Sequence, residues 1–180
     1  EKVNLRYGPE CFFQVNPPQL LKVAGELKTW LKEGKPARLL DLYAGVGTFG
    51  LLLSDLASEV LAVESGDENI FYLKENLKLN QADKIRLAAG RVEKRLKEIV
   101  SFRPDTALVD PPRQGLEPEL IATLKKIPVR SIFYLSCNPA TLARDLNRLR
   151  PEFEPQTIRA FDFFPRTPHL EVLSRLRRAD

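Results

Sequence analysis

The sequence predicts one α/β domain built on a mostly parallel sheet of seven strands that ends in an antiparallel hairpin. Three observations indicate this fold class. Short apolar runs alternate with segments of helical spacing along most of the chain, and the turn after the first run is rich in glycine. The last two strand-like runs have only a proline-containing loop between them, which is too short for a crossover helix and therefore predicts antiparallel pairing.

The expected elements follow in a regular order. An extended lead-in precedes an amphipathic helix over residues 17–32. Buried strands are expected at residues 38–42, 60–64, 85–89, 106–110 and 131–136. Helices are expected at residues 47–57, 67–79, 92–100, 117–126 and 139–149. The closing hairpin is expected from strands at residues 156–162 and 170–176, an arrangement typical of the Rossmann-like class I methyltransferase sheet.

Composition narrows the class of protein. Of the 180 residues, 43% are hydrophobic and 29% charged, which is typical of a soluble globular domain, and the apolar runs are too short to span a membrane. Two cysteines and a single histidine, His169, predict neither a disulfide framework nor a metal site and favour a reducing, cytoplasmic location. A net charge of +4 mildly favours a polyanionic partner, although many soluble domains are slightly basic.

A glycine-rich turn, DLYAGVGTFG, follows the first expected strand and opens a helix. Gly45, Gly47 and Gly50 let the backbone approach a ligand closely, and Glu64 at the end of the next strand suits the hydroxyls of a ribose. Dinucleotides and S-adenosylmethionine share this pattern. Asp41 favours S-adenosylmethionine, because a carboxylate there suits an ammonium group better than a pyrophosphate. A tight turn without a ligand is the remaining alternative.

The segment LVDPPRQG follows the fourth expected strand, at the sheet edge where open α/β folds bind ligands. Its two prolines stiffen the loop. Arg113 stands where amino-methylating enzymes carry an aromatic residue for stacking a base, which argues against adenine-N6 methylation. A proline-rich turn capped by an aspartate is the structural alternative.

Two further side chains could carry chemistry. Cys137 lies between the fifth strand and a helix start that would stabilise a thiolate, although free cysteines are often buried structural residues. Glu171 is the only acid in an apolar strand start and is either solvated on the outer face or a desolvated base. A single histidine in an exposed proline-rich loop, such as His169, is more often neither ligand nor catalyst. Phe12 and Phe13 could stack on bases or anchor the lead-in.

Taken together, the motifs FFQVN, LLDLYAGVGTFG, AVE, LVDPPRQG, YLSCNPATLARDL and FPRTPHLE occur in the order found in one family. The sequence resembles the RNA uracil-C5 methyltransferases, which use S-adenosylmethionine to form 5-methyluridine in tRNA and large ribosomal RNA. The resemblance implies that a thiolate adds to carbon 6 of a uridine, that carbon 5 takes the methyl group, and that a base removes the carbon-5 proton.

The resemblance also implies roles for individual residues. It places the nucleophile at Cys137 and the general base at Glu171. It implies cofactor contacts from Gln14, Tyr43, Thr48, Glu64 and Asp110, to which the residue pattern of the turn adds Asp41, Gly45 and Gly47. Substrate contacts are expected from Phe12, Pro111, Arg113 and Asn138. Arg91 stands where the family usually has a polar Asn or Asp near the adenine, so that contact departs from the pattern.

Family members are longer than this chain. They carry an oligonucleotide-binding-like domain and a central insert, and some hold an iron–sulfur cluster. Residues 1–180 are therefore expected to form the catalytic domain of a longer protein, with residues 1–36 as lead-in and helix and 37–180 as core; the start at Glu1 and the lack of methionine fit a fragment. A monomer that binds RNA is expected. The alternatives are an RNA-binding module with little activity and an NAD-dependent oxidoreductase.

Overall fold

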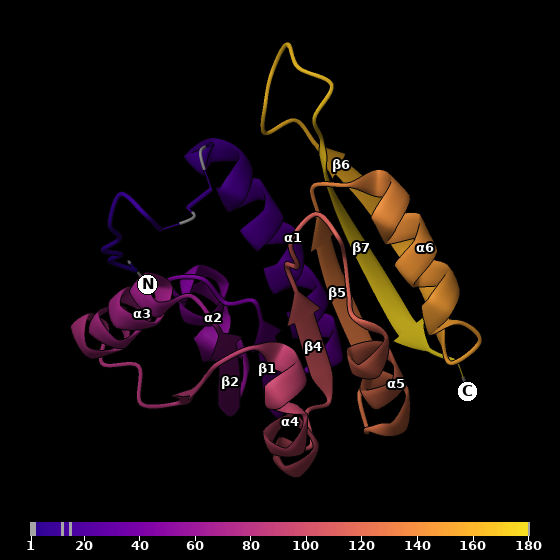
Figure 1. The fold of residues 1–180 in the computed structure, drawn as a ribbon, viewed down its shortest axis with the longest axis horizontal. Helices are drawn as coiled ribbons and strands as arrows, with labels where there is room; N and C mark the ends of the chain where they lie inside the picture. The colour runs from indigo at the N-terminus through magenta and orange to yellow at the C-terminus, as the bar shows by residue number, and fades with distance from the viewer. Residues whose placement is uncertain (1–2, 12, 15, 180) are drawn as a thin grey trace.

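A seven-stranded sheet in the order β3-β2-β1-β4-β5-β7-β6 forms the centre of the computed structural model, which describes residues 3–11, 13, 14 and 16–179 (Figure 1). The strands are β1 (Arg38–Leu42), β2 (Glu59–Glu64), β3 (Ile85–Ala89), β4 (Thr106–Val109), β5 (Ser131–Ser136), β6 (Phe153–Phe161) and β7 (Glu171–Arg178). The first five pair in parallel, and β7 is antiparallel to both β5 and β6. The predicted fold class is confirmed.

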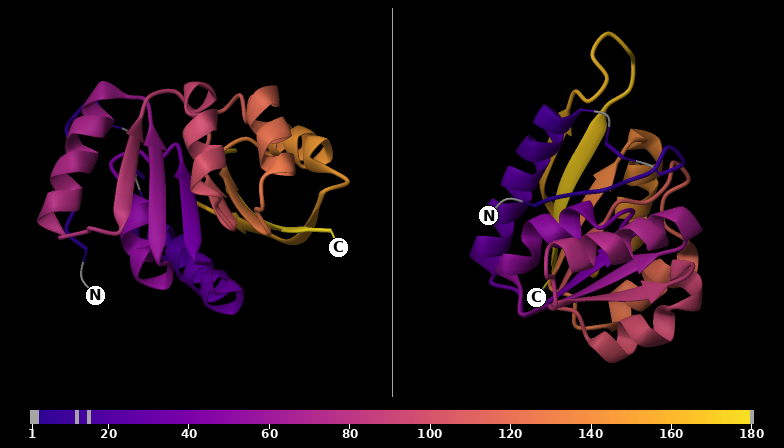
Figure 2. Two further views of the ribbon diagram at one scale, coloured as in Figure 1. Left: turned by 90° about the horizontal axis from the view of Figure 1, so that it is seen from below. Right: turned by 90° about the vertical axis from the view of Figure 1, so that its left-hand side faces the viewer.

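Helices cover both faces of the sheet (Figure 2). They are α1 (Pro17–Gly34), α2 (Thr48–Leu53), α3 (Asp67–Leu79), α4 (Leu96–Phe102), α5 (Pro118–Lys126) and α6 (Pro139–Leu149). Side chains of α1, α2 and α3 share one apolar core, and those of α4, α5 and α6 share the other. The central strands are therefore buried on both sides, which explains why they read as continuous apolar runs. No helix in the described part of the chain is long and apolar enough to cross a membrane.

The strand residues alternate between the two cores. Leu40 and Leu42 of β1 face the core of α4–α6, whereas Leu39 faces the core of α1–α3. All three side chains are fully buried. This two-residue period fixes the register, because a slip by one residue would exchange the two faces.

Several expected elements have different bounds, and three of them depart the most. The helix expected at 47–57 ends as α2 at Leu53 and continues as a 3₁₀ turn, η1 (Ser54–Leu56), where the Ser54 hydroxyl donates to the Leu51 carbonyl at 3.1 Å. The helix expected at 92–100 is divided into a 3₁₀ turn, η2 (Val92–Lys94), and α4. Strand β6 begins earlier than residue 156 because Phe153 is buried in the core beneath the Arg178 guanidinium.

The carboxyl ends of the parallel strands meet at one edge of the sheet. Strand β7 starts at the same edge, and the loop from 162 to 170 that precedes it projects beyond the sheet at the top of Figure 1. The glycine-rich turn, the proline loop, Cys137 and Glu171 therefore come together at this edge, as open α/β sheets arrange their ligand sites.

Candidate active site

The glycine-rich turn leaves β1 through an unusual backbone path. Tyr43, Gly45 and Gly47 have φ angles of 61°, 57° and 89°, in the left-handed region. Such angles are strained for Tyr43 and unstrained for the two glycines. Gly47 precedes α2 directly, so the first amide groups of this short helix, beginning at the buried Thr48, lie at the turn.

The Glu64 carboxylate fixes this turn. One carboxylate oxygen accepts from the Gly45 amide at 2.7 Å, and the other accepts from the Ser65 and Gly66 amides at 2.8 and 2.7 Å. The side chain is buried, and the oxygen that accepts only from Gly45 keeps acceptor capacity. Glu64 is thus held in place to accept further donors such as ribose hydroxyls.

Asp41 lies beneath the turn with an unpaired carboxylate oxygen. Its side chain is 2% exposed, and Oδ2 has no hydrogen-bond partner among the described residues. Burial raises the pKa of Asp41 to about 7; a backbone hydrogen bond from Gly50 opposes the shift, and the Glu64 carboxylate adds to it. Gly50 keeps the space beside it, since a Cβ there would lie 2.9 Å from Oδ2. A buried acceptor without a donor fits an ammonium group of a ligand.

Gln14 and Asp110 extend the polar group across the sheet edge. Gln14 is buried, and its Oε1 has no partner within the described ranges. Desolvation raises the pKa of Asp110 to about 8; the Glu171 and Asp41 carboxylates reinforce the shift, and a hydrogen bond from Gln14 opposes it. The region of the glycine-rich turn and the region of Cys137 therefore meet at the carboxyl groups of Asp41, Asp110 and Glu171.

Cys137 lies on a fixed turn between β5 and α6. The Ser136 hydroxyl spans it, accepting from the Asn138 amide and donating to the Asn138 carbonyl, both at 3.1 Å. The Asn138 side chain caps α6 by accepting from the amides of Ala140 at 3.1 Å and Thr141 at 3.4 Å. The half-buried thiol is thus attached to a rigid strand–helix junction.

A cavity of about 190 Å³ opens beside Cys137. Its lining residues are Arg113, Cys137, Asn138, Pro139, Pro168, His169 and Leu170. Glu171 follows directly in the chain and is 3% exposed. Burial raises the pKa of Glu171 to about 7, and Arg113 opposes the shift. Of the two interpretations of this acid, the structure supports the desolvated one.

The pKa of Cys137 moves against expectation. Sequence position at a helix start predicts a stabilised thiolate, but burial raises the pKa of the thiol, and the Glu171 and Asp110 carboxylates raise it further. Arg113 lowers it. Desolvation and nearby negative charge therefore act against the thiolate that the helix start was expected to stabilise.

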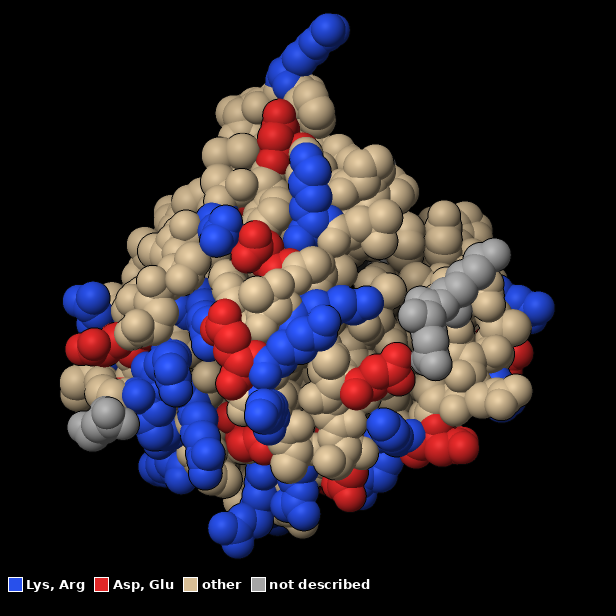
Figure 3. All heavy atoms as spheres, turned by 180° about the vertical axis from the view of Figure 1, so that it is seen from behind, with Lys and Arg blue, Asp and Glu red and all other residues tan. Residues whose placement is uncertain are grey.

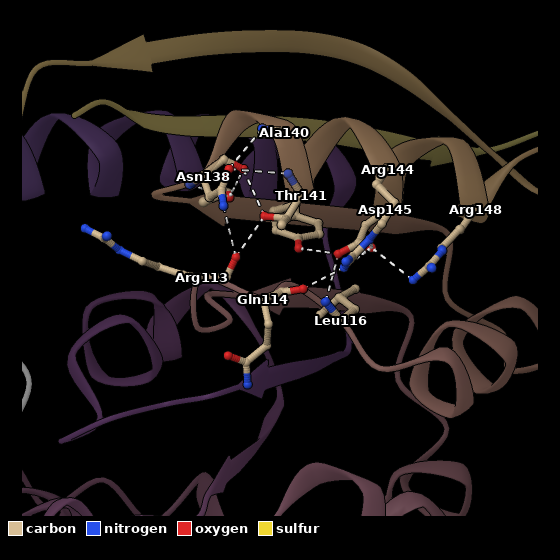
Figure 4. Close-up of polar contacts among 11 residues, drawn as sticks. Arg113, Gln114, Leu116, Asn138, Ala140, Thr141, Arg144, Asp145 and Arg148 are labelled. Carbon is tan, nitrogen blue, oxygen red and sulfur yellow. Dashed lines mark hydrogen bonds and ion pairs between the residues drawn. The ribbon is translucent and has the colours of Figure 1, made fainter. Parts of the chain in front are cut away.

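The proline loop is joined to α6 by side chains that the sequence did not single out (Figure 4). Thr141, Arg144 and Asp145 bind the backbone between residues 113 and 116. In the sequence they read only as the polar positions of an amphipathic helix. Asn138, expected to contact substrate, uses its amide to donate to the Arg113 carbonyl at 3.2 Å.

For the other residues expected at the site, the structure gives their burial or their neighbours. Pro111 is buried, and Arg91 is exposed and paired with Glu93 at 3.3 Å. Phe12 lies outside the described residues. Phe13 stacks on Tyr7 with ring centroids 4.4 Å apart.

Asn76, which sequence reasoning missed, anchors the lead-in. Its amide donates to the carbonyls of Arg6 and Val46, both at 2.9 Å, and its oxygen accepts from the Arg6 amide at 2.7 Å. One buried side chain thus ties the lead-in to the glycine-rich turn.

The charged surface is mixed on the face shown in Figure 3, opposite the view of Figure 1. Lys and Arg are interspersed with Asp and Glu there. Two arginines of the hairpin pair with acids of α1: Arg159 with Glu26 at 3.3 Å and Arg175 with Glu33 at 2.5 Å. Among the described residues, no group of three or more His, Cys, Asp or Glu could hold a metal ion.

The sheet order, the antiparallel β7 and the glycine-rich turn define a Rossmann-like methyltransferase fold. A precorrin-6y C5,15-methyltransferase from Geobacter metallireducens has this fold at 14% identity, with a TM-score of 0.71 over 98% of this chain and 95% of that one. More specifically, the family model described as tRNA (Uracil-5-)-methyltransferase matches residues 1–179. The chain belongs to this family.

Individual relatives agree with the family match. The tRNA (uracil(54)-C(5))-methyltransferase of Pyrococcus horikoshii is 40% identical over 168 residues, covering 93% of this chain and 39% of its own length. An RNA methyltransferase of Lactobacillus johnsonii is 39% identical over 95% of this chain and 38% of its own length. The Pyrococcus abyssi tRNA (uracil-54, C5)-methyltransferase, solved with S-adenosyl-L-homocysteine, superposes with a TM-score of 0.82 at 34% identity, covering 98% of this chain and 43% of that one. The chain thus spans about two-fifths of the length of these relatives.

Proposed function

We propose that this chain is the catalytic domain of an RNA uracil-C5 methyltransferase that transfers a methyl group from S-adenosylmethionine to carbon 5 of a uridine. The observation that carries the proposal is the desolvated Glu171 carboxyl beside the Cys137 thiol. A uracil methylation at carbon 5 needs both a nucleophile and a base at one place. The names of the relatives, tRNA (uracil-54, C5)-methyltransferases, support the same reaction.

The cofactor half of the site fits S-adenosylmethionine. When bound, this cofactor supplies an electrophilic methyl group on a sulfonium. Asp41 offers its unpaired carboxylate oxygen to the ammonium, and Glu64 offers its remaining acceptor capacity to ribose hydroxyls. Gln14, Tyr43, Gly45, Gly47, Thr48 and Asp110 complete the residues assigned to this half.

Cys137 and Glu171 divide the chemistry on the uracil. Carbon 5 is a weak nucleophile until the Cys137 thiolate adds to carbon 6 and places negative charge on carbon 5 and the carbonyl oxygen. Carbon 5 then takes the methyl group, Glu171 removes the proton from carbon 5, and elimination restores the free thiol. A carboxyl with a pKa of about 7 is a suitable proton acceptor near neutral pH.

Arg113 is placed to stabilise the charge that develops in this reaction. Its side chain lines the Cys137 cavity and lowers the pKa of both Cys137 and Glu171. A guanidinium there can donate to the enolate oxygen of the uracil. The target base must leave its stack to reach the cavity beside Cys137.

The test is methyl transfer to defined RNA. The chain is incubated with labelled S-adenosylmethionine and transcripts of tRNA or ribosomal RNA, and the modified nucleotide is mapped. Label in carbon 5 of one uridine supports the proposal and distinguishes the two kinds of RNA. Label elsewhere in the RNA contradicts it.

A second candidate is an RNA-binding module with little activity of its own, which the coverage of only about two-fifths of the relatives' length favours. RNA binding without label in any transcript supports this candidate. Calorimetry with S-adenosylmethionine and with NAD distinguishes the methyltransferase and the RNA-binding module from an oxidoreductase. The oxidoreductase would bind NAD rather than S-adenosylmethionine.

A further inference from the structure

Side chains of α6 and of its N-cap residue hold the loop after β4 at three of its residues (Figure 4). The Arg113 carbonyl accepts from the Asn138 amide at 3.2 Å and from the Thr141 hydroxyl at 3.1 Å, a hydroxyl shared with the Asn138 carbonyl at the same distance. The Gln114 carbonyl accepts from Arg144 at 2.6 Å. Asp145 accepts from the Leu116 amide at 2.8 Å.

Asp145 is the buried centre of this contact. Its carboxylate is fully buried and also accepts from the Tyr134 hydroxyl at 2.9 Å and from Arg144 at 2.9 Å. Gly115 has a φ of +78°, and a Cβ there would overlap the Asp145 carboxylate. The backbone can approach this closely only because residue 115 is glycine, so the loop and the helix fit each other at a specific point.

The held backbone carries Arg113 at the Cys137 cavity. In Figure 4 the Arg113 side chain extends away from the α6 network while its carbonyl points toward the helix. The side chain is exposed and makes no hydrogen bond or ion pair among the described residues, so the contacts that hold residue 113 there are those of its backbone carbonyl. Arg113 also supplies the charge that opposes the carboxylates around the thiol.

We infer that Thr141, Arg144 and Asp145 are positioning residues that fix the 113–116 backbone and thereby keep the Arg113 guanidinium at Cys137. The inference rests on the proposed function in one respect, the role of Cys137 as the nucleophile. None of the three positioning residues needs to touch RNA or cofactor.

A loosened loop has a measurable consequence at the thiol. The charged and titratable groups around Cys137 are Glu171 from β7, Asp110 after β4, Arg113 from the loop and His169 from the β6–β7 loop. If Arg113 moves away, the two carboxylates act unopposed and the thiol pKa rises further. A smaller thiolate fraction reacts more slowly with an alkylating reagent.

The experiment follows alkylation of Cys137 by iodoacetamide in the free chain, with the Cys137 and Cys11 peptides separated by mass spectrometry. In Thr141→Val, which removes the hydroxyl donor at nearly the same volume, we expect about threefold slower alkylation at neutral pH, as for a half-unit pKa rise. Thr141→Ser is expected to restore the rate, and Arg113→Gln to slow it at least as much. Asp145→Asn, which releases Arg144, is expected to act in the same direction.

Thr123→Val is the matched control. Thr123 lies on α5, and its hydroxyl donates to the Glu119 carbonyl at 2.8 Å rather than to the loop. Its alkylation rate should equal that of the wild type. A wild-type rate in Thr141→Val, or in Arg113→Gln, overturns the inference. Alkylation needs neither RNA nor cofactor, so absent methyl transfer contradicts the proposed function without affecting this result.

Discussion

Two buried aspartates show how differently the two halves of the site are built. Asp41, beneath the glycine-rich turn, has a carboxylate oxygen with no partner among the described residues. Asp145, on α6, accepts from a backbone amide, a tyrosine hydroxyl and an arginine. Both are almost fully excluded from solvent.

The difference distinguishes a binding group from a structural group. A buried carboxylate oxygen without a donor costs stability, and a ligand that supplies the missing donor recovers that cost. A buried carboxylate with all donors present stabilises the arrangement around it. The cofactor half is therefore open to a cation, and the Cys137 half is held together by its own side chains.

The largest expected effect is in Cys137→Ala. Methyl transfer should fall at least about a thousandfold, because the substitution removes the thiol that adds to carbon 6. Binding of S-adenosylmethionine should stay within about twofold, since the cofactor half does not depend on the thiol. Label incorporation measures methyl transfer, and calorimetry measures cofactor binding. An active Cys137→Ala variant would show that Cys137 is not the nucleophile. Loss of cofactor binding in this variant would show that the cofactor site depends on Cys137.

Glu171→Gln tests the role of the base in the Cys137 half of the site. Without the base, the carbon-5 proton remains and the thiol cannot be eliminated, so turnover should drop about a hundredfold or more. A covalent RNA adduct should accumulate and migrate slowly on a denaturing gel. The control is Glu154→Gln on the exposed side of β6, which should form no adduct. Normal turnover of Glu171→Gln would exclude it as the base.

The two aspartates predict opposite outcomes for the same substitution. Asp41→Asn should weaken S-adenosylmethionine binding about tenfold without lowering the melting temperature at neutral pH, because it removes a desolvated charge. Asp145→Asn should lower the free energy of unfolding by about 1–2 kcal/mol and leave cofactor affinity nearly unchanged. Calorimetry and thermal melts measure both variants. Equal loss of stability in the two would contradict the contrast.

The smallest expected effect is in pH dependence. Cofactor binding requires the Asp41 carboxylate, whose pKa is raised to about 7. Affinity should therefore rise about fivefold between about pH 6 and pH 7, and Asp41→Asn should flatten this rise. The sign for stability is opposite: the folded state favours the protonated acid, so this contribution to stability is present at low pH and lost as pH rises through about 7. A flat affinity profile in the wild type would exclude Asp41 as the titrating group.

Much of the fold could be predicted from local pattern. The bounds of β1, β3, β5, α3 and α6 are those expected, since apolar period, proline and capping residues act over a few positions. The placement of Cys137 and Asp110 at strand ends followed from the same pattern. The roles of Asn76 and Asp145 could not be predicted, because their partners lie 70 and 29 residues away in the chain.

Residue pattern alone was enough for the strand–helix order, the reversed last strand and the gathering of motif residues at one sheet edge, since these depend on spacing and connection length. Tertiary packing decided the electrostatic state of the site. It left one Asp41 oxygen without a partner among the described residues, desolvated Glu171, and raised the pKa of Cys137 instead of lowering it. A pKa depends on burial and on charges from distant segments, and those are fixed only when the elements pack together.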